Sequence, residues 1–198
     1  EWNTSAMTND NKHDEPFAAA MIAKTLADND GLVEGYAYWT FSDIFEESGQ
    51  LAGAFHGGFG LLTYYGIAKP AYRLFELFHG LGKERIGIWS DKEDTTVEAL
   101  ATKTDSGYRV IVYNHNIPEE PIKDETISLD LSVLTDKKTA VIYRIDESHA
   151  NPKKMWQELG EPEYLKKNDV IKLHQASELV AHKIEFESEL VLTVPAHG

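Results

Sequence analysis

The sequence contains no cysteine, fewer basic than acidic residues and no long apolar run. The lack of cysteine excludes disulfides, thiolate nucleophiles and cysteine-ligated zinc. Lysine and arginine number 19 against 33 acidic residues, giving a net charge of −14, so we expect no nucleic-acid partner, because phosphate binding needs clustered cations. No apolar run approaches the roughly 18–20 residues of a membrane-spanning helix, so we expect no membrane partner.

The length, the first residues and the histidines of the sequence limit the domain number, the location and the cofactors that we expect. A chain of 198 residues suits one or two domains with a sizeable core. It opens at Glu1 without a secretory pattern, and we interpret it as cut from something longer. The absence of cysteine favours a cytoplasmic location. The eight histidines form no HExxH motif and no i, i+4 pair, so we expect no metal and no other cofactor.

Residues 1–83 have the pattern of alternating helix and strand. Asp14 is a candidate N-cap for a helix whose apolar residues repeat at helical spacing. A second helix is predicted over residues 69–81, with Pro70 at its start. Between them, residues 33–41 are aromatic-rich, which suits a buried strand. This order is typical of βα repeats.

Residues 84–198 have a different pattern, with short segments in which apolar and polar residues alternate. Such segments, separated by turn signals, predict seven or so strands in an antiparallel sandwich and a mainly β fold. The Lys166-Lys167 pair is interpreted as part of a solvated loop. The predicted strands cover residues 86–89, 97–102, 108–113, 127–131, 140–145 and 184–194.

Three short motifs could carry chemistry. Residues 1–5 (EWNTS) place the carboxylate of Glu1 beside an aromatic residue, as a glycosidase nucleophile requires, although a terminal glutamate is more often solvated. Trp39, followed by acidic residues at 43, 46 and 47, could stack on a sugar face, or it could be a core residue before a solvated acidic loop. Residues 55–60 (FHGGFG) could form a substrate-covering loop or a flexible connection.

Taken in order, these motifs resemble glycoside hydrolase family 39, in its β-xylosidase branch. The resemblance rests on EWNTS at 1–5, HDE at 13–15, YWTFSD with EE at 38–47, FHGGFGL at 55–61 and KP at 69–70. It implies a retaining hydrolase of β-xylosides, built as a (β/α)8 barrel with an attached β-sandwich. Residues 1–83 would then be the end of the barrel, from strand 7 through helix 8, and residues 84–198 the accessory sandwich.

The resemblance also implies roles for individual residues. Glu1 matches the catalytic nucleophile. Trp39, Glu46 and Glu47 match positions that line the sugar-binding subsite, and His56 lies in a family-like segment near it. The family's acid/base glutamate belongs to an Asn-Glu-Pro motif, which this sequence lacks.

Two expectations follow for this chain. It should be inactive alone, and its residues 1–83 should be ordered mainly where they pack on the sandwich. The expected partner is a xylo-oligosaccharide, with a homo-oligomer of the full-length protein as a further option.

Two other functions compete with this interpretation. One is a carbohydrate-binding or structural β-sandwich without catalysis; several of its candidate aromatic residues look like core, which favours the structural version. The other is the iduronide-cleaving branch of the same family, whose substrate carries a carboxylate. The region of Asp43, Glu46 and Glu47 has no nearby arginine or lysine, so a neutral pentose fits better. The candidate binding aromatics are Trp89, Tyr113, Tyr143, Trp156 and Tyr164.

Overall fold

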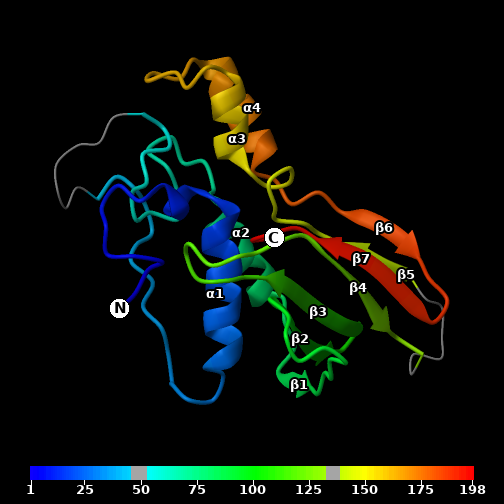
Figure 1. Ribbon diagram of the computed structural model, residues 1–198. Coiled ribbons are helices and arrows are strands. Elements are labelled where there is room, and N and C mark those ends of the chain that lie inside the picture. The colour runs from blue at the N-terminus through cyan, green and yellow to red at the C-terminus, as the bar shows by residue number, and fades with distance from the viewer. Residues whose placement is uncertain (46–52, 133–138) are drawn as a thin grey trace.

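The computed structural model describes residues 1–45, 53–132 and 139–198 (Figure 1). The predicted subsite residues Glu46 and Glu47 lie outside these residues. The helices are η1 (Asn11–Asp14), α1 (Pro16–Asp28), α2 (Pro70–His79), α3 (Pro152–Glu158) and α4 (Lys167–Ala176). The strands are β1 (Glu84–Ile86), β2 (Val97–Thr104), β3 (Gly107–Asn114), β4 (Glu125–Asp130), β5 (Thr139–Ile142), β6 (His182–Glu185) and β7 (Glu189–Val194).

The strands form three small antiparallel sheets. One has the order β1-β2-β3, and the others pair β4 with β7 and β5 with β6. In β7 the alternation of the sequence is realised, because Leu190 and Val194 are buried while Glu189 and Val191 are exposed. The described sheets do not close into a barrel, and none of the described helices is long and apolar enough to span a membrane.

The main core lies between α1, α2 and the sheet that contains β3 (Figure 1). Ile22 of α1 is fully buried, and Leu74 of α2 packs in the same cluster. Leu100 and Tyr113 contribute the sheet's side of this core. One hydrophobic core therefore crosses the predicted boundary between residues 83 and 84, and the division into two domains stays a prediction.

The strand expected over residues 33–41 is not formed. Only Tyr38 makes a bridge, to Trp2, while Leu32, Val33 and Phe41 are exposed. A strand needs hydrogen-bonding neighbours along its length, and an aromatic-rich composition does not supply them. The sequence pattern predicted the apolar character of this segment without revealing which chain segments would lie beside it.

The helical pair α3–α4 was missed by the sequence analysis. Lys166 and Lys167, expected in a solvated loop, stand at the start of α4, where the amide of Lys166 donates to Oδ2 of Asp169 at 3.1 Å. Asn151 caps α3, and Pro152 occupies its first turn. Because of this pair, helices and strands take similar shares of the described residues, so a mainly β description is too narrow.

The five aromatic residues considered for a binding surface have different environments. Tyr113 is part of the core, and Trp156 is partly buried and donates from its indole nitrogen to the carbonyl of Pro162 at 3.0 Å. The other three are exposed, by 90% for Trp89, 78% for Tyr164 and 43% for Tyr143. Several of the five were expected in the core; the first two lie there, and the other three do not.

Candidate active site

The segment that begins with Glu1 lies parallel to the segment that contains Trp39. The amide of Trp2 donates to the carbonyl of Ala37 at 3.0 Å, and the amide of Trp39 donates to the carbonyl of Trp2 at 2.9 Å. These bonds make Trp2 and Tyr38 a parallel bridge. Glu1 is exposed next to this bridge, so the structure brings the predicted nucleophile and the predicted sugar platform onto adjacent segments.

The indole of Trp39 is half-buried at the end of this pairing. It packs edge-on against Phe45, with 5.0 Å between ring centroids and planes at 84°. The peptide bond between Trp39 and Thr40 is cis. Thr40 then bonds through its amide to the carbonyl of Phe59 at 2.9 Å, which connects this segment to the glycine-rich stretch at residues 55–60.

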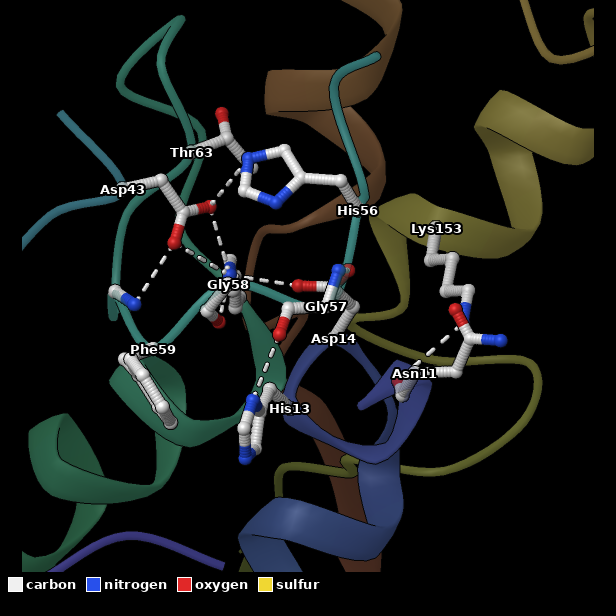
Figure 2. Close-up of polar contacts among 12 residues, drawn as sticks. Asn11, His13, Asp14, Asp43, His56, Gly57, Gly58, Phe59, Thr63 and Lys153 are labelled. Carbon is white, nitrogen blue, oxygen red and sulfur yellow. Dashed lines mark hydrogen bonds and ion pairs between the residues drawn. The ribbon is translucent and has the colours of Figure 1, made fainter. Parts of the chain in front are cut away.

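His56, predicted to bind substrate, lies buried beside Asp43 (Figure 2). Its Nε2 is 3.8 Å from Oδ2 of Asp43, and neither ring nitrogen has a hydrogen-bond partner in the described part of the chain. Burial lowers the pKa of His56, with Asp43 opposing the shift. A sugar contact by this residue stays a prediction.

A buried lysine stands at the centre of the polar contacts. Nζ of Lys69 lies 2.6 Å from Oδ1 of Asp14 and 2.8 Å from Oδ2 of Asp43, and it donates to the carbonyl of Gly58 at 3.0 Å. The side chains of Lys69 and both aspartates are fully buried. We call these three residues the charge cluster; its groups carry one positive and two negative formal charges.

The pKa shifts in the charge cluster follow from burial and pairing. Burial alone would lower the pKa of Lys69, but the two carboxylates outweigh it and raise that pKa. Burial raises the pKa of Asp43, and the Lys69 ammonium opposes the rise. Lys69 therefore stays charged at neutral pH and neutralises part of the buried negative charge.

The glycine-rich stretch is tied to η1, just before α1, through Gly57 (Figure 2). The amide of Gly57 donates to Oδ2 of Asp14 at 2.7 Å, and its carbonyl accepts from Nδ1 of His13 at 2.8 Å. Gly57 has φ +73°, and a Cβ there would meet the Asp10 backbone at 2.6 Å, so only glycine fits. Asp14 was predicted as the N-cap of α1, but Glu15 takes that position. The carboxylate of Asp14 instead accepts from the amide of Gly57.

The charge cluster was not predicted from the sequence, although its residues stand in the motifs that carry the family resemblance. Asp14 comes from HDE, Asp43 from YWTFSD and Lys69 from KP. One feature of the sequence could have indicated this cluster: Lys69 stands directly before Pro70, the proline that begins a helix. That position is surrounded by buried chain, where a lysine needs anionic partners.

The pair α3–α4 supports the glycine-rich stretch from the opposite side. Phe55 packs on Trp156 with ring centroids 5.8 Å apart, and Ile67 and Leu173 are fully buried in the same small core. Lys153 of α3 also pairs with Glu15 at 2.6 Å. The segment between residues 53 and 67 is therefore held between the charge cluster and this helical pair.

Chemically, the arrangement offers an exposed carboxylate, a half-buried indole and a braced backbone. No group of three or more metal-ligating side chains is arranged to hold a metal ion in residues 1–45, 53–132 and 139–198. Carboxylate and aromatic side chains are the groups that glycosidases use on sugars.

Comparison with known proteins places this geometry in a family. The model of "Glycosyl hydrolases family 39" matches residues 1–188. A protein named "Beta-xylosidase" from Caldicellulosiruptor saccharolyticus is 42% identical over 187 residues, which are 94% of this chain and 38% of the relative. A second "Beta-xylosidase", from Geobacillus stearothermophilus, is 30% identical over 166 residues, which are 83% of this chain and 31% of that protein.

A solved structure shows the same fold. The GH39 enzyme from Xanthomonas axonopodis pv. citri superposes with a TM-score of 0.80 at 23% identity, over 99% of this chain and 42% of that one. The chain thus spans less than half the length of each of these proteins. The matched residues cover both the site segments and most of the strand-rich part, and the chain therefore belongs to glycosyl hydrolases family 39.

Proposed function

We propose that these residues are the C-terminal part of a retaining β-xylosidase, with Glu1 as its nucleophile. Two relatives that cover most of the chain are named for this activity. The observation that carries the proposal is the parallel pairing of Trp2 with Tyr38, which sets the Glu1 segment beside the Trp39 segment. Adjacent parallel segments that end in a carboxylate and an aromatic residue suit a sugar subsite at the ends of barrel strands.

The proposed reaction is a double displacement. The carboxylate of Glu1 attacks the anomeric carbon of the xyloside, and the bond to the leaving oxygen breaks as a second carboxylic acid protonates that oxygen. The second group, now ionised, removes a proton from water, which attacks the anomeric carbon and releases Glu1. In this scheme the indole of Trp39 stacks on the sugar, and Glu46, Glu47 and His56 bind its hydroxyl groups.

The sequence holds no Asn-Glu-Pro motif for the second carboxyl group. Protonation of the leaving oxygen typically contributes a factor of about 10²–10⁴ to such reactions. We therefore propose that the 198 residues alone do not turn over xylosides, and that the activity belongs to a longer protein that supplies the acid/base and acts on xylo-oligosaccharides.

The test is covalent labelling of the full-length enzyme. A 2-fluoro-β-xyloside with a good leaving group should form a stable glycosyl-enzyme, and peptide mass mapping should place the sugar on Glu1. The variant Glu1→Gln, which keeps the shape but not the nucleophile, should take no label. If the folded enzyme were not labelled and left the matching xyloside intact, the xylosidase proposal would fail.

A further inference from the structure

We propose that Asn3 is the positioning residue that holds the Glu1 segment in its reactive place. The inference rests on the proposed function, because it assigns a task to a residue beside the proposed nucleophile. The side-chain amide of Asn3 connects three separate stretches of the chain: its own segment, residues 38–39 and the glycine-rich stretch.

The hydrogen bonds of Asn3 use the full capacity of its amide. Oδ1 accepts from the hydroxyl of Tyr38 at 2.9 Å, from the amide of Thr4 at 2.6 Å and from the hydroxyl of Thr4 at 3.3 Å. Nδ2 donates to the carbonyls of Trp39 and Phe59, the latter at 3.2 Å. Two carbonyls can be served only by the NH₂ group, so the partners also fix which way the amide faces.

Aspartate and serine could not replace this set of bonds. An aspartate would place a carboxylate against two carbonyl oxygens, and a serine offers a single donor. Around an extended residue such as Trp2, residues 1 and 3 point to the same face of the chain. Fixing the side chain of Asn3 therefore also restricts the direction in which Glu1 points.

Tyr38 fixes the oxygen end of the Asn3 side-chain amide. Its ring packs between Trp2 and Phe75, at centroid distances of 5.5 Å and 5.4 Å. Burial raises the pKa of Tyr38, so its hydroxyl stays protonated and donates to Asn3. Changing Tyr38 to phenylalanine removes this one bond and keeps both ring contacts.

The experiment compares Asn3→Ala and Tyr38→Phe in the full-length enzyme, with Asn116→Ala as the matched control. Asn116 is a half-buried asparagine whose side chain, in the described structure, bonds nearby backbone: it accepts from the amide of Ile117 at 2.9 Å and donates to the carbonyl of Pro121 at 2.9 Å. The measurements are the rate of Glu1 labelling by the 2-fluoro-β-xyloside and the inhibition constant of xylose. Because a small misplacement of a reacting group can cost about 10²-fold, we expect Asn3→Ala to slow labelling about 10- to 100-fold.

Tyr38→Phe should slow labelling less than Asn3→Ala, and Asn116→Ala should not slow it. The inhibition constant of xylose should change less than the labelling rate in Asn3→Ala and Tyr38→Phe, because sugar binding does not depend on the direction of Glu1, and it should not change in Asn116→Ala. If Glu1 of the wild type is labelled and both Asn3→Ala and Tyr38→Phe are labelled as fast, the positioning role is overturned while the proposed function stands. Should Asn3→Ala fail to fold, the labelling rate of Tyr38→Phe, compared with that of the wild type, still tests the positioning role.

A second measurement separates this inference from the proposed function. In the 198-residue chain, hydrogen exchange of the Trp2 and Trp39 amides reports whether the two segments stay paired. Asn3→Ala should speed the exchange of both amides, and Asn116→Ala should not. Unchanged exchange in Asn3→Ala would overturn the positioning role even if Glu1 is the nucleophile, whereas absence of a label on Glu1 would overturn only the function.

Discussion

Replacing Lys69 with methionine is the sharpest test of the charge cluster. Methionine fills a similar volume but removes the only cation that contacts Asp14 and Asp43 in the described structure. Both carboxylates would be left fully buried without their partner, and the carbonyl of Gly58 would lose its donor. We therefore expect a large loss of stability from a change that removes almost no volume.

The magnitude follows from the burial of the pairs. Removing one partner of a buried ion pair costs about 3–5 kcal/mol, and here one change orphans two carboxylates. Small proteins are stable by only about 5–15 kcal/mol, so Lys69→Met should remove a third or more of the free energy of unfolding. Urea titration followed by tryptophan fluorescence measures the loss as a shift of the midpoint.

Lys153→Met is the matched control. Its partner Glu15 is 40% exposed, although Lys153 itself is only 7% exposed, so the carboxylate can regain water when the lysine is removed. We expect a loss of about 1 kcal/mol there. Adding Asp14→Asn and Asp43→Asn to Lys69→Met should recover part of the stability by removing the orphaned charges. If Lys69→Met cost no more than Lys153→Met, or if the two asparagines made it worse, the account of the charge cluster would be refuted.

Two further predictions concern a histidine and a glycine. The pKa of His115 is lowered to about 4 by burial and by the neighbouring His197, so the unfolded chain binds more protons and stability is lost as the pH falls from about 6.5 to 4. His115→Phe should therefore lose less stability than the wild type between pH 7 and pH 5 in urea titrations, and equal losses would contradict this. At Gly60 a Cβ would lie 2.2 Å from the Asp43 amide nitrogen, so Gly60→Ala should cost about 1–3 kcal/mol. Gly35→Ala, with nothing within 4 Å of its Cβ, should stay within about 0.5 kcal/mol when both variants are measured by urea titration, and a similar cost at both glycines would be evidence against the close contact.

The parts of the fold that the sequence predicted well depend on local patterns. The helix that starts at Pro16 and the helix that starts at Pro70 have proline in their first turn and regularly spaced apolar residues, which are properties of a short stretch of chain. The same holds for β2 and β3, whose predicted ranges differ from the observed ones by a residue or two. Element ends are the least certain part of any such prediction.

The parts that were missed depend on contacts between distant residues. Lys69 meets a partner 26 residues earlier in Asp43 and another 55 residues earlier in Asp14, and no local pattern shows that these three side chains share a buried space. Residues 33–41 have the composition of a strand, but only their last part, from Ala37 to Phe41, makes backbone hydrogen bonds to neighbouring segments. The family resemblance was carried by short motifs, and the structure shows that several of them meet through the charge cluster.

The candidate site was predicted in part. The structure brings the segments of Glu1 and Trp39 together, which their separation in sequence could not show. His56 lies in a buried contact with Asp43, whereas the glycine-rich composition around it suggested a flexible or substrate-covering loop. The importance of Asn3 was hidden because three of the five groups that its side chain bonds are backbone groups, which leave no trace in the sequence.

Strands β5 and β6 pair with each other, although the chain between them is long and contains two helices. Ile142 stands opposite His182 in the register, so the segment from 143 to 181, which contains α3 and α4, leaves the sheet and returns at one point. Such a segment can detach as a unit while the strands that close it remain paired. Detachment would expose Ala54, Phe55 and Ile67 to water and remove the outer support of the glycine-rich stretch. The outer support of the glycine-rich stretch therefore comes from a segment that contributes none of the proposed site residues.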